Sequence, residues 1–350
     1  MEEKRERLPH WIDRPLTAEE VLEDDKLDRL PFARTVVDEV HRVSGANGFV
    51  VSIEGEWGSG KTTILHVVEK LLTVGANGGP PVIVHFNPWL IGEREALLKL
   101  FISTLADAVD QSDPLGAGKR AAEQLRAYAK AFDVLKLIPG AEPWASLMKQ
   151  LLETMGNAVG AIAEHKTPDL EKSKHAVAEK LREFDRRVIV FIDDMDRLYP
   201  KEVFEMVRII KAVGDLPNVG YVIAWDPKYV QDALSGLNVP QAGTYLDKII
   251  NVRLPMPVLS ARARDRLMKD ALGTLPEDVH AQYFTHGEES LQSLYHNGLR
   301  DLLEYPRDFS RVFAIVHTLE PSLRGEIVLG DIIALAAVMV TASPVFRINQ

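Results

Sequence analysis

Short apolar runs alternate along the chain with segments whose apolar residues recur at helical spacing. The runs Phe49–Ile53 and Val82–Phe86 have the length and the β-branched content of buried strands. Between them the apolar residues follow one face of a helix, at the spacing i, i+3, i+4, i+7 and i+8: Ile64, Val67, Val68, Leu71 and Leu72. The pattern predicts a strand, a helix and a second strand in succession.

Three further runs extend this alternation. Val188–Ile192 is wholly apolar, as expected for a parallel strand that helices cover on both faces. Gly220–Trp225 and Ile249–Leu254 predict two more strands, and Pro200–Val213 predicts a helix before them. Beyond Pro257 only helical patterns occur. We therefore predict an α/β fold with a parallel sheet, followed by a C-terminal helical lid.

These patterns suggest three domains. We expect a polar, helical lead-in over residues 1–48 and a core over residues 49–257. The core contains a helical insertion at about residues 94–185, which is too charged to span a bilayer. Residues 258–350 form the lid.

Composition narrows the class of protein. The 350 residues include no cysteine, which fits a reducing compartment, and the N-terminus lacks the apolar stretch of a secretory signal. Because no apolar run reaches the ~18 residues of a spanning helix, we expect a cytoplasmic protein with no transmembrane segment. A net charge of -10 does not indicate a DNA-coating surface, although a local basic patch that binds DNA remains open.

The segment Gly55–Thr62 fits the P-loop pattern at every fixed position. Glycines let the backbone turn so that its N–H groups face phosphate oxygens, and the following helix adds its positive N-terminal end. Lys61 is expected to reach the β- and γ-phosphates, and Thr62 to ligate magnesium. The predicted nucleotide contacts are Gly55, Glu56, Gly58, Ser59, Gly60, Lys61, Thr62 and Thr63.

Two carboxylates follow the third predicted strand. Asp193 ends an apolar strand, which places it at the carboxyl edge of the sheet where magnesium is expected. Asp194 is a candidate to polarise the attacking water, although its side chain is shorter than glutamate. Asp196 and Arg197 follow, and a pair between these two is an alternative reading.

Two further residues are candidates with alternatives. Asp226 ends the fourth strand, where a polar group can sense the γ-phosphate, but it is equally a good N-cap before Pro227. Arg307 lies in the lid and could close over the phosphates of its own chain or reach those of a neighbouring subunit. As an alternative, it is an ordinary surface arginine.

The motifs favour an ATP-hydrolysing switch that uses ATP and Mg²⁺. One alternative is an oligomeric scaffold clamped by nucleotide with little turnover, because the short Asp194 leaves hydrolysis open. A P-loop kinase is a weaker alternative, since the lid lacks a dense arginine cluster for a second phosphorylated substrate. Thiol catalysis is excluded without cysteine, and no Gly-x-Ser-x-Gly motif occurs.

The chain resembles the KAP family of P-loop NTPases over most of its length, because it carries five motifs in the order in which that family has them. They are Gly55–Thr63, Phe86–Trp89, Ile192–Arg197, Tyr245–Ile250 and Tyr305–Arg311. Pro88 stands where the family pattern has a small residue, so the resemblance assigns no role to Asn87.

The resemblance implies more than the residues alone. It implies a five-stranded sheet in the order 5-1-4-3-2, magnesium held by Thr62 and Asp193, hydrolysis assisted by Asp194 and nucleotide sensing by Arg307. Many members carry transmembrane helices before the acidic motif, and this chain looks like a bacterial member without them. The resemblance also favours anti-phage defence, with homo-oligomers or effector proteins as partners. The lid looks unfinished at Gln350, so we expect the native chain to continue.

Overall fold

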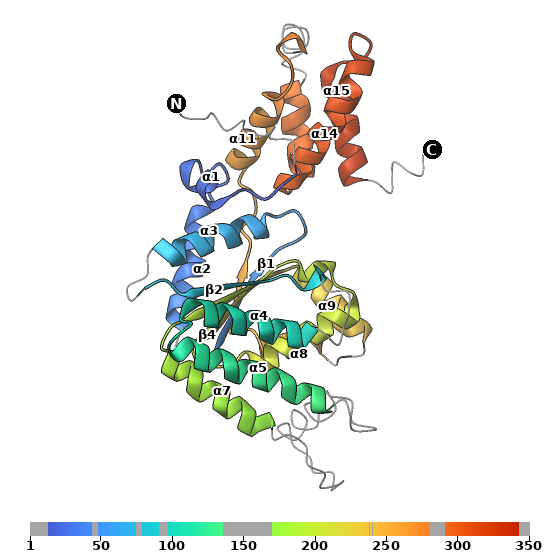
Figure 1. Ribbon diagram of the computed structural model, residues 1–350. Helices are drawn as coiled ribbons and strands as arrows, with labels where there is room; N and C mark the ends of the chain where they lie inside the picture. The colour runs from blue at the N-terminus through green and yellow to red at the C-terminus, as the bar shows by residue number, and fades with distance from the viewer. Residues whose placement is uncertain are drawn as a thin grey trace. The chain divides into compact units, whose positions relative to one another are not determined.

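The structure is a computed structural model that falls into two compact units (Figure 1). Unit 1 consists of residues 1–36, 54–71 and 255–350, and unit 2 of residues 37–53 and 72–254. The structure describes residues 13–43, 48–74, 79–90, 97–135, 170–237, 239, 241–279 and 291–342. Parts of the expected insertion, residues 94–96 and 136–169, and the chain end at Gln350 lie outside the described residues. The three expected domains stay a prediction.

Five strands form one parallel sheet in the order β2-β3-β4-β1-β5, which confirms the order expected above. The strands are β1 (Phe49–Glu54), β2 (Val82–Phe86), β3 (Val188–Ile192), β4 (Val219–Trp225) and β5 (Val252–Pro255). At the carboxyl ends of β2 and β3, Phe86 is paired with Ile192. The residues that follow these two strands therefore leave the sheet side by side.

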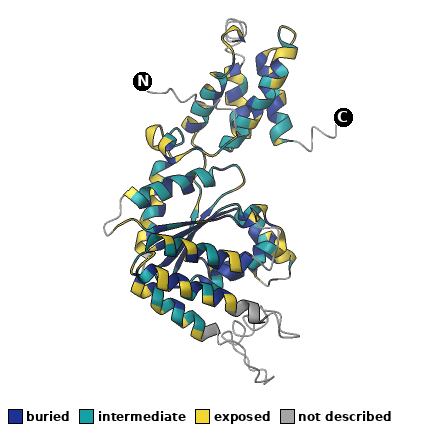
Figure 2. Cartoon of the chain, in the orientation of Figure 1, coloured by how far each residue is buried: buried dark blue, intermediate teal, exposed yellow. Residues whose placement is uncertain are grey.

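Helices of unit 2 pack around this sheet (Figure 1). Helix α4 packs on β2, α5 packs on α4, and α7 packs on α5. Every residue of β3 and β4 is buried, and the strands form the dark centre of this unit in Figure 2. The helices are α4 (Leu97–Ser112), α5 (Ala117–Leu135), α7 (Leu170–Phe184), α8 (Pro200–Val213), α9 (Pro227–Gly236) and α10 (Ala242–Asp247).

Unit 1 has a hydrophobic core of its own. Apolar residues of α11, α14 and α15 form it, with Phe313 and Ile333 fully buried. Among the described residues after Pro257 all regular elements are helical, as predicted. The helices of unit 1 include α1 (Ala18–Glu23), α11 (Ala261–Leu272), α14 (Pro306–Leu323) and α15 (Leu329–Thr341). Two helices, α2 (Leu30–Val43) and α3 (Lys61–Val74), begin in unit 1 and end in unit 2. No helix in the described part of the chain is long and apolar enough to cross a membrane.

The fifth strand begins later than its apolar residues suggest. We predicted a strand from Ile249, but β5 begins at Val252. The N–H groups of Ile249 and Ile250 both donate to the carbonyl oxygen of Leu246, at 2.9 Å, and so close the end of α10. These two β-branched residues are buried in a turn, where hydrogen bonding to the preceding helix overrides their strand propensity.

Gly220 offers a test of how closely β1 and β4 pack. A Cβ atom at this position would lie 1.9 Å from Cζ of Phe49. We expect Gly220→Ala to lower the free energy of unfolding by about 3 kcal/mol, because the core must move to admit a methyl group. Denaturant unfolding measures this loss.

Gly236 provides the control for this substitution. It lies at the end of α9, where an added Cβ meets no atom within 4 Å. Gly236→Ala should leave stability unchanged or raise it by about 0.5 kcal/mol. Equal unfolding free energies for the two variants would contradict the close packing of Gly220 on Phe49.

Candidate functional site

The P-loop follows β1 directly and has the backbone that its sequence predicts. Gly58 and Gly60 have φ angles of 90° and 94°, in the left-handed region that glycine adopts without a steric penalty. Helix α3 begins at Lys61, so the positive N-terminal end of the helix follows the loop directly. A helix N-terminus behind a glycine loop is suited to bind an anion.

Lys61 and Ser59 are buried polar residues of this loop. Lys61 has 7% of its surface exposed, and its Nζ donates to the carbonyl oxygens of Gly55 and Glu56 at 2.8 and 3.2 Å. The Ser59 hydroxyl is buried and makes no hydrogen bond within the described residues. Burying such a group without a partner is costly, and phosphate oxygens would satisfy it.

Helix α14 packs its first turns on the P-loop, within unit 1. The Arg307 guanidinium lies 4.0 Å from the centroid of the Trp57 ring. A Cβ atom at Gly58 would lie 2.9 Å from Cβ of Arg307, so the arginine side chain lies directly on this glycine. Burial raises the pKa of Tyr305 to about 12, and a hydrogen bond to Glu56 adds to this shift. The lid therefore contacts three consecutive P-loop residues.

The polar groups of Arg307 are only partly paired. Its Nε lies 2.8 Å from a carboxylate oxygen of Asp13. Its Nη1 is buried and makes no hydrogen bond among the residues that the structure describes. Arg307 thus carries an unused donor beside the P-loop, which is what a phosphate-sensing arginine requires.

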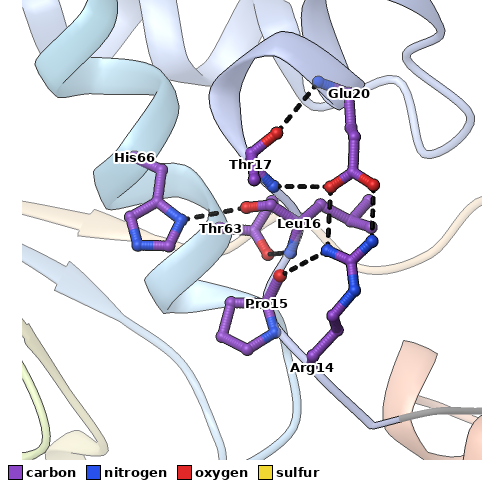
Figure 3. A network of polar contacts seen from close by, with 7 residues as sticks. All are labelled: Arg14, Pro15, Leu16, Thr17, Glu20, Thr63 and His66. Carbon is purple, nitrogen blue, oxygen red and sulfur yellow. Dashed lines mark hydrogen bonds and ion pairs between the residues drawn. The ribbon is translucent and has the colours of Figure 1, made fainter. Parts of the chain in front are cut away.

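The segment that begins at Asp13 is bonded to α3 (Figure 3). The N–H of Leu16 donates to Oγ1 of Thr63 at 3.1 Å, and its carbonyl oxygen lies 2.9 Å from Nδ1 of His66. A hydrogen bond from Arg14 holds the pKa of Glu20 at about 2. Thr63, predicted to contact nucleotide, thus binds the N-terminal segment.

The acidic residues lie at the carboxyl end of β3, in unit 2. Oδ1 of Asp193 accepts a hydrogen bond from the N–H of Asp194 at 2.8 Å. Oδ2 of Asp194 accepts one from Nδ2 of Asn87 at 3.0 Å, and its Oδ1 lies 2.8 Å from Nε of Arg197. Arg197 therefore pairs with Asp194. A pair between Arg197 and Asp196, the alternative reading, stays a prediction.

Asp226 caps a helix, as one of its two readings predicts. Its Oδ1 accepts hydrogen bonds from the N–H groups of Lys228 and Tyr229, at 2.9 and 3.3 Å, at the start of α9. The sensing role of Asp226 stays a prediction.

No role could be predicted from the sequence for Trp57, Asp13, Tyr305 or Asn87. A contact of Trp57 could have been expected, because the P-loop pattern does not specify this position and a large aromatic ring there favours packing against another side chain. The Trp57 side chain is 54% exposed and lies under Arg307. Asp13 gave no signal, since its partner lies 294 residues away in the chain.

The residues present fit a nucleotide with magnesium. The buried Ser59 hydroxyl, the Lys61 ammonium group and the unpaired Arg307 Nη1 are all donors, as phosphate oxygens require. Magnesium prefers hydroxyl and carboxylate oxygens, and Thr62 in unit 1 and Asp193 in unit 2 each carry one of these groups.

The fold and the loop define a P-loop NTPase. The chain belongs to the KAP family, since the model of the KAP family P-loop domain matches residues 29–323. It is similar to the phage T7 exclusion protein of Escherichia coli (strain K12), with 29% identity over 226 residues. That match covers 59% of this chain and 30% of the relative, so the chain spans under a third of that protein.

Three solved structures are similar to this chain in fold. The Aeropyrum pernix ORC2 protein has 13% identity and a TM-score of 0.41, over 89% of this chain and 67% of that one. The Aeropyrum pernix ORC1 protein in complex with DNA has 13% identity and a TM-score of 0.40, over 95% of this chain and 71% of that one. Cdc6p from Pyrobaculum aerophilum has 12% identity and a TM-score of 0.40, over 84% of this chain and 62% of that one.

Proposed function

We propose that the protein binds ATP with Mg²⁺ at the P-loop and hydrolyses it to switch between conformations. The observation that carries this proposal is the loop itself: two glycines with left-handed backbone, the buried Lys61, and buried donors on Ser59 and Arg307 that lack a partner among the described residues. Such a set of donors matches a polyphosphate.

Each residue has a role in the proposed hydrolysis. Lys61 binds the β- and γ-phosphates, and Arg307 stabilises negative charge on the γ-phosphoryl oxygens. Asp194 orients a water molecule and takes its proton, while the water oxygen bonds to the γ-phosphorus and the bond to the bridging oxygen breaks. The products are ADP and inorganic phosphate. When bound, magnesium neutralises charge on the phosphate oxygens, and Thr62 and Asp193 would hold it.

Phosphate release in the steady state tests the proposal. It should be measured for the whole chain with ATP and Mg²⁺, with and without DNA and candidate partner proteins, and with Lys61→Ala as the blank. A rate equal to the blank under every condition would reject hydrolysis.

A scaffold that binds nucleotide with little turnover is the second candidate. The short side chain of Asp194 favours it, because an aspartate carboxylate reaches less far towards the γ-phosphate than the carboxylate of a glutamate. Tight ATP binding in the absence of phosphate release would support this candidate.

Replacing each of the two carboxylates should have a different effect. Asp193→Asn is expected to weaken nucleotide binding that depends on magnesium, because it removes a charged metal ligand. Asp194→Asn is expected to bind ATP normally and to hydrolyse it ~10²-fold more slowly. Titration with a fluorescent nucleotide, with and without magnesium, and phosphate release measure the two effects. A parent rate in Asp194→Asn would remove this residue from the mechanism.

We also propose a role in bacterial anti-phage defence, supported by the similarity to the phage T7 exclusion protein. Plating efficiency of phage T7 on bacteria that express the parent or the Lys61→Ala variant tests this role. Equal plating on both strains and on cells without the gene would count against it.

A further inference from the structure

The segment Phe86–Trp89 was singled out by its sequence, but the proposed function gives it no role. It follows β2, and β2 lies beside β3 in the sheet. Since Phe86 is paired with Ile192, Asn87 leaves the sheet beside the acidic residues that follow β3. The register of the two strands therefore brings a neutral amide to the proposed hydrolytic carboxylate.

Asp194 is held from two sides. The Asn87 amide donates to its Oδ2 at 3.0 Å, and the Arg197 guanidinium contacts its Oδ1 at 2.8 Å. Arg197 in turn lies 5.7 Å from the centroid of the Trp89 ring, which limits where the guanidinium can move. The segment after β2 thus supplies one direct partner of Asp194 and a support for the other.

The backbone of Asp194 adds to this constraint. Its φ and ψ angles are 57° and 28°, a left-handed conformation that non-glycine residues rarely adopt. Such a conformation persists only where the surroundings fix it. The charged residues next to it in the chain are Asp193 before it and Asp196 and Arg197 after it, and Arg197 pairs with Asp194 itself.

The amide of Asn87 is not explained by packing alone. Its Oδ1 is buried and accepts no hydrogen bond from the described residues, which is unfavourable for the fold. The contact that the amide does make is the one with Asp194.

We propose that Asn87 and Arg197 are positioning residues that aim the Asp194 carboxylate at the attacking water. This inference rests on the role of Asp194 in the proposed function. A carboxylate has about four lone-pair sites, so two donors fix its orientation and still leave positions for water. Because aspartate is short, a small rotation would carry its oxygens away from the water, and misplacement of about 1 Å is costly to a reaction.

The test compares Asn87→Ala and Arg197→Ala with a matched control. Asn297 donates from Nδ2 to the Ser293 hydroxyl at the same 3.0 Å, but it is exposed and its partner is neutral. We expect both test variants to lower kcat about 10- to 100-fold, with KM for ATP and ADP affinity unchanged. Asn297→Ala should match the parent, and Arg197→Lys should recover part of the lost rate.

A double variant separates positioning from a general loss of structure. In an Asp194→Asn background, Asn87→Ala should cause no further loss, because both act through one carboxylate. A multiplicative loss there, or a parent kcat in Asn87→Ala, would overturn the proposal. If Asn87→Ala does not fold, the isosteric Asn87→Asp decides, and its kcat should fall at least as far. A parent rate in Asp194→Asn alone would instead reject the proposed role of Asp194.

Discussion

Lys61→Ala should abolish measurable nucleotide binding while the protein stays folded. Lys61 is buried, and alanine removes the positive charge that is proposed to bind the phosphates. Removing a buried, hydrogen-bonded charge weakens binding by about 10³-fold. Titration with a fluorescent ATP analogue in the presence of Mg²⁺ measures the change.

Lys70 supplies the control for this variant. It lies on the same helix, α3, and pairs with Glu19 at 2.9 Å on the surface. Lys70→Ala should therefore bind the analogue with parent affinity. Because Lys61 also bonds the carbonyl oxygens of its own loop, thermal unfolding of both variants should be compared. Near-parent affinity in a folded Lys61→Ala protein would mean that the P-loop is not the nucleotide site.

Arg307→Ala should lower kcat by about 10³-fold and leave ADP affinity nearly unchanged. The arginine is proposed to act on charge that develops at the γ-phosphoryl group, which ADP lacks. Arg307→Lys keeps the charge but loses the planar group that stacks on Trp57, so its kcat should lie between that of the parent and that of Arg307→Ala. Arg262, an exposed arginine on α11, provides the control, and Arg262→Ala should match the parent.

Mixing two inactive variants shows which chain supplies the arginine. Arg307 lies on Gly58 and Trp57 of its own chain, which supports action within that chain. We therefore expect no recovery of hydrolysis when Arg307→Ala protein is mixed with Asp194→Asn protein. Recovered activity would show that a neighbouring subunit supplies Arg307 and that the active form is an oligomer. A parent rate in Arg307→Ala alone would reduce Arg307 to a packing residue.

Local patterns were enough to predict the strands and the P-loop backbone, whereas the order of the strands in the sheet was implied by the resemblance to the KAP family. Periodicity and glycine spacing are properties of a few consecutive residues, and β1 to β4 lie within a residue of their predicted bounds. β5 was predicted three residues too early, because hydrogen bonding at the end of α10 is invisible in a run of apolar residues. The roles of Asp193, Asp194 and Thr62 stay predictions.

Contacts between distant parts of the sequence could not be read in the same way. Asn87 and Asp194 are 107 residues apart, and their contact depends on the register of β2 and β3. The contacts of Arg307 depend on how α14 folds back on the P-loop. Asp226 had two readings from sequence, and in the structure its carboxylate caps α9.

The division of unit 1 into three separate stretches of chain has a consequence for its synthesis. Residues 54–71 leave the ribosome long before residues 255–350, yet both belong to this unit. Lys26 and Asp270, which form an ion pair within it, are 244 residues apart. Assembly of the unit must therefore wait for the last stretch, since distant contacts form only when both ends exist. A prematurely terminated product would carry a complete P-loop sequence without Arg307 or the helix that packs on it.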